Sequence, residues 1–333
     1  MAAFDLPSRN AARAALSRRQ LGGLALLFAA ACVLPFLVSD YRVFQFTLVL
    51  VYAIALLGLN MLTGYNGQIS LGHGAFYAIG AYTAAILMDK FGLPYWATVP
   101  VAGAVCLVAG FLFGLPALRL EGLYLALATF ALGVAMPQLL KYKGLEQWTG
   151  GVQGITILKP DAPGWIDISQ DRWLYFVVLL HVVVLFVIGW NLLRGRIGRA
   201  MVAIRDQPIA AQAMGVNTAM VKSLTFGVSA MYTGIAGALG AIVIQFVAPD
   251  SFLIFLSITL VVGVVIGGLA SISGAIYGAI FIQFIPNIAD HISKAAPWAI
   301  YGVVLIVFMV VMPTGVAGFV RIAYGRLRRW RAR

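Results

Sequence analysis

Long apolar stretches separated by short polar connections occupy most of the chain. Several of these stretches reach about 18–20 residues, the length that an α-helix needs to cross a hydrocarbon core roughly 30 Å thick. The pattern predicts an all-α, polytopic membrane helical bundle of about ten transmembrane helices. The predicted helices cover residues 21–38, 43–62, 75–88, 96–114, 123–140, 174–193, 221–246, 252–270, 274–289 and 297–312.

Composition excludes a soluble globular protein. Apolar residues make up 62% of the 333 residues and charged residues only 10%, whereas a soluble domain carries roughly 25% charged residues to hydrate its surface. The two cysteines, Cys32 and Cys106, lie inside apolar stretches and lack the spacing of a metal site or a disulfide framework. We therefore expect no metal and no other cofactor.

The basic residues predict the orientation of the bundle. The net charge of +12 gathers in blocks between or beyond the apolar stretches, which is the positive-inside pattern and does not indicate nucleic-acid binding. An even number of helices with basic ends places both termini in the cytoplasm. We expect a basic cytoplasmic segment at 1–20, a transmembrane domain at 21–312 and a basic cytoplasmic tail at 313–333. Within the domain, 141–173 is expected to be a periplasmic loop and 194–220 a cytoplasmic loop.

The first apolar stretch, 21–38, resembles the core of a secretory signal peptide because several arginines precede it. No small-x-small cleavage site follows it, and it is long for a signal peptide. We expect it to remain as the first helix.

A polar, glycine-rich segment at 60–74 separates the second and third predicted helices. Its hydrogen-bonding side chains include Asn60, Thr63, Gln68, Ser70 and His73. Irregular backbone at membrane depth is tolerated only where protein or a water-filled cavity satisfies its hydrogen bonds. The segment is therefore either part of a polar path through the membrane or a glycine-rich cytoplasmic turn.

Catalysis is not favoured by the residues present. Ser70 and His73 have no acidic partner nearby in the sequence, and the chain contains no GxSxG, HExxH or GxxxxGK[ST] motif. We expect no catalytic residues, so any nucleotide energy has to come from a partner. The predicted helices also contain no Asp or Glu, which leaves an ion-coupled carrier without the charged groups that relay an ion.

A short helix is predicted at 208–214 within the basic loop. Pro208 suits the first position of a helix, and Gly215 can end the helix in the left-handed conformation. The segment is too short to span a membrane and has an apolar face to bury. It is either a docking element for a cytoplasmic partner or a surface helix that rests on lipid headgroups.

A faint internal similarity links the two halves of the chain. It can reflect a structural repeat of the kind found in transporters, or chance in a glycine-rich sequence. The matching residues are Gly67, Gly74, Ala75 and Tyr77 in the first half and Gly267, Gly274, Ala275 and Tyr277 in the second.

Five motifs, in order along the chain, carry a resemblance to a known family. They are Gly-Gln-Ile-Ser-Leu-Gly-His-Gly-Ala-Phe at 67–76, Gly-Ala-Tyr-Thr-Ala-Ala at 80–85, Leu-Pro-Ala-Leu-Arg-Leu-Glu-Gly-Leu-Tyr-Leu-Ala at 115–126, Thr-Gly-Gly-Val-Gln-Gly-Ile at 149–155 and Gly-Arg-Ala-Met-Val-Ala-Ile-Arg-Asp at 198–206, which continues to Asn217. The chain resembles permeases of branched-chain amino acid ABC importers over roughly residues 45–320, in an order that fits the M-type Liv permeases. The Gly-Tyr-Asn-Gly run at 64–67 is a departure from the family's pattern. It falls at a position that varies among members of the family.

The resemblance implies a permease subunit of an ATP-driven importer in the bacterial inner membrane. It implies a second permease in a heterodimer, two cytoplasmic ATPase subunits that hydrolyse the ATP, and a periplasmic substrate-binding protein, all beside membrane lipid. The solute would be a branched-chain amino acid or a related small amino acid, amide or organic acid. A stand-alone channel or secondary carrier for a small polar solute is the alternative.

The resemblance also implies roles for individual residues. The stretch 198–217 would contain the coupling helix that presses into a groove on the ATPase. Arg199, Arg205 and Asp206 would orient that helix, while Ala210, Met214 and Gly215 would lie in the contact. Candidates for the translocation path are Asn60, Gln68, Ser70, His73 and Tyr77.

Overall fold

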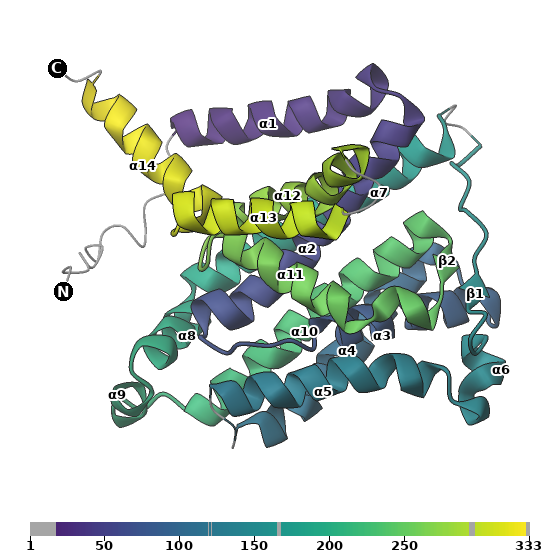
Figure 1. Ribbon diagram of the computed structural model, residues 1–333, viewed down its shortest axis with the longest axis horizontal. Coiled ribbons are helices and arrows are strands. Elements are labelled where there is room, and N and C mark those ends of the chain that lie inside the picture. The colour runs from purple at the N-terminus through teal and green to yellow at the C-terminus, as the bar shows by residue number, and fades with distance from the viewer. Residues whose placement is uncertain (1–17, 119, 121, 165–167, 293–296, 331–333) are drawn as a thin grey trace.

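The computed structural model describes residues 18–118, 120, 122–164, 168–292 and 297–330, so most of the predicted segment 1–20 lies outside the described residues. The described chain is almost entirely helical (Figure 1). Its helices are α1 (Arg18–Leu37), α2 (Asp40–Asn60), η2 (Met61–Tyr65), α3 (His73–Asp89), α4 (Tyr95–Ala117), α5 (Leu123–Leu140), η3 (Lys143–Leu145), α6 (Glu146–Thr149), α7 (Gln170–Arg194), α8 (Arg196–Asp206), α9 (Pro208–Ala213), α10 (Thr218–Ile244), η4 (Pro249–Phe252), α11 (Ile254–Gly267), α12 (Ile272–Ile292), α13 (Pro297–Val311) and α14 (Gly315–Trp330). Two short strands, β1 (Ile155–Thr156) and β2 (Phe246–Val247), complete the fold.

The ten predicted apolar helices are all present, with ends shifted by a few residues. Among the described residues, eight helices are long and apolar enough to cross a membrane. The other two predicted helices are α3, which has 17 residues, and α1, whose described apolar part covers Phe28–Leu37. The prediction of an all-α, polytopic bundle is confirmed.

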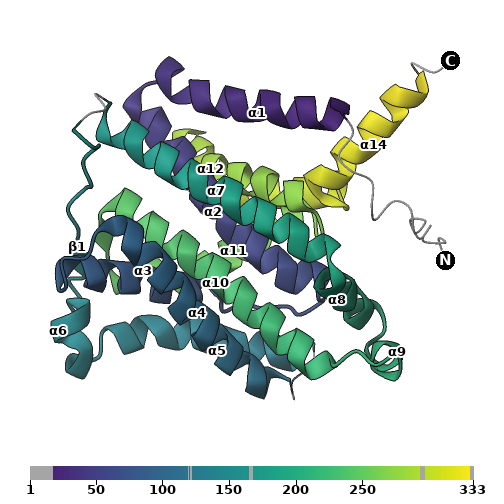
Figure 2. The ribbon, with the colours of Figure 1, turned by 180° about the vertical axis from the view of Figure 1, so that it is seen from behind.

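Helix α10 lies at the centre of one group of helices and packs against α2, α3 and α4 (Figure 2). Glycines allow these close approaches, because the absence of a side chain lets two helix backbones come together. A Cβ added to Gly58 of α2 would lie only 2.8 Å from the carbonyl oxygen of Ser229 in α10. A Cβ added to Gly80 of α3 would meet the carbonyl group of Gly234 in α10, and one added to Gly234 would meet Cys106 of α4.

Helices α11 and α12 form a second tightly packed pair, which lies against α2. A Cβ on Gly274 would lie 2.8 Å from the carbonyl oxygen of Gly267, and Gly278 meets the carbonyl of Gly263. Helix α2 therefore contacts both groups and has one face toward each. Its last eight residues, 53–60, are all buried.

Two non-helical breaks follow α2 and α11. In the first, α2 widens into the π-helix η2, and the non-helical residues 66–72 lead to α3. In the second, residues 268–271 separate α11 from α12, with positive φ angles at Gly268 and Ala270. Of the similar residues in the two halves, Gly67 lies inside the first break and Gly267 is the last residue before the second, while the others lie in the helices that follow, α3 and α12.

The two ends of the described chain lie on one side of the bundle. Helix α1 begins and α14 ends on the side that carries α8 and α9, while β1 and α6 lie on the opposite side (Figures 1 and 2). Both ends on one side agree with an even number of helices crossing the bundle from one side to the other. The cytoplasmic placement of that side stays a prediction. The tail predicted at 313–333 contains a helix, α14, which the apolar pattern did not predict.

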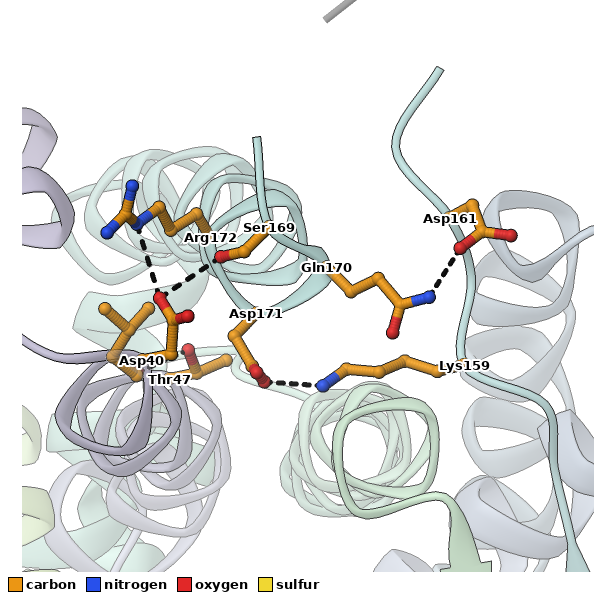
Figure 3. Close-up of polar contacts among 9 residues, drawn as sticks. Asp40, Thr47, Lys159, Asp161, Ser169, Gln170, Asp171 and Arg172 are labelled. Carbon is orange, nitrogen blue, oxygen red and sulfur yellow. Dashed lines mark hydrogen bonds and ion pairs between the residues drawn. The ribbon is translucent and has the colours of Figure 1, made fainter. Parts of the chain in front are cut away.

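The segment expected to be a periplasmic loop is attached to the bundle by polar contacts (Figure 3). Lys159 pairs with Asp171 of α7 at 2.6 Å, and Arg172 Nε lies 3.4 Å from Asp40 Oδ1 at the start of α2. Strand β1 pairs antiparallel with β2, placing Ile155 opposite Val247. The described parts of this segment, 141–164 and 168–173, therefore cover this side of the protein.

Candidate functional site

Helices α8 and α9 form a compact element on one side of the bundle. Pro208 is the first residue of α9 and Gly215, with φ +83°, follows its end, so the predicted start and left-handed end of this helix are confirmed. Asn217 directly precedes α10, and its Oδ1 accepts a hydrogen bond from the backbone N–H of Met220 at 3.0 Å. This is a standard N-cap, in which a side-chain oxygen satisfies an otherwise unpaired helix donor.

Helix α8 was not predicted from the sequence, although a signal for it is present. Gly198, Met201 and Ile204 are its buried residues, and their three-residue spacing places them on one face of a helix. Gly198 packs directly against the carbonyl of Leu193, at the end of α7. Arginines on the other faces made the stretch too polar to stand out among the long apolar helices.

Helix α9 exposes apolar side chains. Ile209 is 82% exposed and Met214 is 85% exposed. Ala210 is also exposed, and a Cβ added to Gly215 would meet nothing within 4 Å. Any close packing at Ala210, Met214 or Gly215 therefore has to come from another molecule.

Arg205 connects α8 to the break after α2. Its Nη1 donates a hydrogen bond to the carbonyl oxygen of Gly64 at 2.8 Å, and its Nε donates to Asp206 Oδ1 at 2.9 Å. Gly67 has φ +75°, and a Cβ added there would lie 2.8 Å from Arg205 Cγ. The arginine therefore holds η2 and the following loop against the end of α8. Within the described part of the chain, Arg199 donates instead to the carbonyl oxygen of Arg194 at 3.3 Å, on an exposed surface.

A buried chain of hydrogen bonds begins at Ser70 and crosses three helices. Ser70 Oγ lies 2.9 Å from His73 Nδ1, His73 Nε2 lies 2.7 Å from Ser229 Oγ, and Ser229 donates to the carbonyl oxygen of Gly58 at 2.7 Å. Because Ser229 uses its proton on Gly58, it accepts from His73 Nε2–H, and Nδ1 then accepts from Ser70. His73 is thus a neutral linker between the loop, α3, α10 and α2. Ser70, His73 and Ser229 are fully buried.

Asn60 holds the second break. Its Nδ2 donates to the carbonyl oxygens of Ser271 at 2.8 Å and Gly268 at 3.4 Å, and its Oδ1 accepts from Ala270 N–H at 2.9 Å. The amide is buried and its hydrogen bonds go to backbone groups. Asn60 therefore joins two parts of the fold and offers little to a passing solute in this conformation.

Tyr77 lies apart from the other candidates for the path. It packs in the core of the bundle, with its ring 6.1 Å from that of Phe252 and its backbone against Gly237 of α10. Gln68 differs, because it lines a cavity of about 160 Å³ beside Arg205. The structure thus places Gln68 and Arg205 at one cavity, Ser70 on His73, and Asn60 against Gly64, the residue that Arg205 binds.

Asn66 is a further residue of this region that the sequence analysis did not select. It lines the same cavity, the residue is only 2% exposed, and neither Oδ1 nor Nδ2 has a hydrogen-bond partner among the described residues. Ser229 was missed as well, because a serine in an apolar helix carries no local signal. Asn66 lies in the polar segment 60–74, and nothing in the sequence distinguishes it from the other polar side chains there.

Comparison with known proteins now identifies the family. Residues 41–312 match the family described as the permease component of branched-chain amino acid transport systems. The chain is 40% identical over 283 residues to the high-affinity branched-chain amino acid transport system permease protein LivM of Escherichia coli, covering 78% of this chain and 66% of LivM. It is 24% identical to the permease protein LivH of Salmonella typhimurium, covering 80% of this chain and 91% of LivH. The chain thus spans slightly less than two thirds of the length of LivM, and no solved structure gives a significant match. The chain belongs to the family of permease components of branched-chain amino acid transport systems.

Proposed function

We propose that the chain is a transmembrane permease subunit of an ATP-driven ABC importer in the bacterial inner membrane. The solute is a branched-chain amino acid or a related small amino acid, amide or organic acid. Family membership supports this proposal, as does the branched-chain amino acid transport in the names of its relatives. The contact between Arg205 and Gly64 is the observation that carries it, because this contact joins an exposed helix to the polar break inside the bundle.

In the proposed mechanism, α9 docks into a groove on a cytoplasmic ATPase subunit. Ile209 and Met214 supply apolar surface for that contact, and burying such anchors is what stabilises a docked helix. When ATP closes the paired ATPases, α8 and α9 move together. Arg205 transmits the movement to η2, and the chain through His73 carries it to α3, α10 and α2.

The remaining partners are assigned from the resemblance and the surface. A second permease forms a heterodimer with this chain, and a periplasmic binding protein delivers solute to the side that carries β1 and α6. Many apolar side chains point outward from the spans and suit either lipid or the second permease. Examples are Val108 and Leu112 of α4, Val187 of α7 and Val310 of α13.

A stand-alone carrier is supported less well. The acidic side chains within the spans lie at their ends, as Asp40, Asp171 and Asp250 do. Carriers driven by protons or sodium usually place ionisable groups inside their spans. This distribution favours an external source of energy.

Reconstitution tests the proposal. The chain is purified with its second permease and two ATPases, placed in proteoliposomes with the binding protein, and assayed for uptake of labelled leucine, urea and an aromatic amino acid. We expect uptake only with ATP, and faster uptake of leucine than of urea. The chain reconstituted alone serves as the control. Full-rate uptake by the chain alone without nucleotide would establish a channel or carrier instead.

A further inference from the structure

The last helix, α14, changes from apolar to basic along its length. The last apolar span ends at Ala323, which lies inside α14. From Tyr324 to Arg333 the sequence contains five arginines and no acidic residue. A change from apolar to basic residues at the end of a span is typical of the boundary between the hydrocarbon core and the lipid headgroups. That boundary therefore falls within α14.

The direction of α14 suits a helix at this boundary. Helix α13 packs beside α12, whereas α14 points away from the bundle on the side that carries α8 and α9 (Figure 1). Pro313 and Gly315, which has φ +71°, lie at the change of direction. An amphipathic helix with basic residues that leaves the direction of the spans at the membrane boundary is suited to the headgroup region.

The first turn of α14 is fixed to the break after α11. Gly315 and Ala317 are buried, and a Cβ added to Gly315 would lie 2.6 Å from the Cα of Gly268. The next turn exposes large apolar side chains, because Phe319 is 49% exposed and Ile322 is 51% exposed. Packing within the protein thus holds one end of α14, while apolar side chains farther along remain available to lipid.

The positive charge of α14 is not neutralised by neighbouring acids. On the side that carries β1 and α6, basic side chains have acidic partners, as Lys141 has in Asp250 at 2.6 Å. In contrast, residues 313–333 contain six arginines and no acid. Arg321 is exposed and forms no ion pair within the part of the chain that the structure describes. An anion from outside the protein can therefore pair with this segment.

The chemistry of α14 indicates which anion it takes. A guanidinium group pairs well with the phosphate of a lipid headgroup, and acyl chains cover apolar side chains such as Phe319 and Ile322. A free phosphate ion would leave those side chains without an apolar partner. We propose that α14 lies in the headgroup region and binds anionic phospholipids of the leaflet on the side that carries α8 and α9. Because α14 is also fixed to Gly268, the bound headgroups anchor the break after α11 to the bilayer surface.

The test compares two lipids on the full chain, purified in a nonionic detergent. Binding of labelled phosphatidylglycerol is measured beside that of phosphatidylcholine with the same acyl chains. We expect phosphatidylglycerol to bind at least about tenfold more tightly, because each arginine near an anionic surface contributes about fivefold. The preference should fall as salt rises from about 0.1 M to about 1 M, since the screening length falls from about 10 Å to about 3 Å. Inorganic phosphate at matched ionic strength should not displace the lipid.

A variant of α14 locates the binding. Arg326→Gln, Arg328→Gln and Arg329→Gln together remove three of the positive charges of α14 and leave Arg321, which is nearest the bundle, in place. The affinity for phosphatidylglycerol should fall at least about tenfold, and the affinity for phosphatidylcholine should stay the same. The corresponding Arg→Lys replacements keep the charge and should keep most of the preference. The comparison of headgroups and of salt on the wild type needs no variant to fold.

A control variant removes the same charge on the opposite side. Lys90→Gln, Lys141→Gln and Lys143→Gln lower the net charge by the same amount. Lys90 and Lys141 already pair with Asp89 and Asp250, so they contribute little to lipid binding. We expect this variant to keep the preference for phosphatidylglycerol.

Three outcomes would overturn the inference. The first is equal affinity of the wild type for the two lipids, and the second is an unchanged preference after the loss of the three arginines. The third is an arginine variant that keeps its lipid preference but no longer co-purifies with the ATPase subunits, because α14 would then dock a protein. Lipid binding requires neither ATP nor transport, so each of these outcomes leaves the proposed function standing.

Discussion

The two helix breaks look alike in the sequence but differ in how their polar groups are used. At the break after α11, the Asn60 amide bonds to three backbone groups, and Gly267 and Gly274 pack backbone against backbone. At the break after α2, the Asn66 amide has no partner and a cavity adjoins it. The break after α11 is closed by hydrogen bonds within the protein, and the break after α2 keeps unused groups beside α8. We infer that the break after α11 is rigid and that the break after α2 is the one that moves.

The largest expected effect comes from opening the rigid break. Asn60→Leu leaves the carbonyls of Gly268 and Ser271 and the N–H of Ala270 unpaired in a buried place. Each loss costs about 1–3 kcal/mol, so three losses should lower the free energy of unfolding by at least about 3 kcal/mol. The midpoint of thermal unfolding of the purified transporter, measured in one detergent, reports this change.

Asn66→Leu is the matched control for that comparison. The same exchange at the first break removes no hydrogen bond within the protein, because the Asn66 amide makes none. Its unfolding midpoint should stay close to that of the wild type or rise slightly. If both variants lost the same stability, the two breaks would not differ in the way described here.

A smaller effect is expected at the end of α9. Gly215 has φ +83° and open space around it, so Gly215→Val strains the backbone by about 1–2 kcal/mol without a clash. The strain changes how α9 ends, and we expect ATP-driven uptake to fall while membrane insertion stays normal. Labelled uptake and the amount of protein in the membrane fraction measure the two quantities.

Gly92 offers the control for local strain. It lies between α3 and α4, has φ +61° and also has nothing within 4 Å of an added Cβ. Gly92→Val should cause a similar small loss of stability and leave uptake unchanged. A loss of uptake in both variants would show that strain, and not the coupling segment, is responsible.

The sequence predicted the long helices well, because a run of apolar residues long enough to span a membrane is a strong signal. It also predicted α9, whose start and end are marked by Pro208 and Gly215. It did not predict α8, because a short amphipathic helix depends on packing against Leu193 and its neighbours. The surroundings of individual polar residues could not be predicted. Asn60 and Gln68 look equivalent in the sequence, and only the positions of their partners distinguish a structural amide from one that lines a cavity.

Arg205 provides the most direct test of the central claim, that movement of α8 and α9 reaches the break after α2 through one side chain. Arg205→Ala and Arg199→Ala are compared for the amount of leucine imported per ATP hydrolysed by the reconstituted transporter. Arg205 bonds to Gly64 inside the bundle, whereas Arg199 bonds only at the exposed end of α7. We predict a fall of about tenfold for Arg205→Ala, as expected for losing one hydrogen bond from a charged donor, and little change for Arg199→Ala. An unchanged ratio in Arg205→Ala would contradict the account.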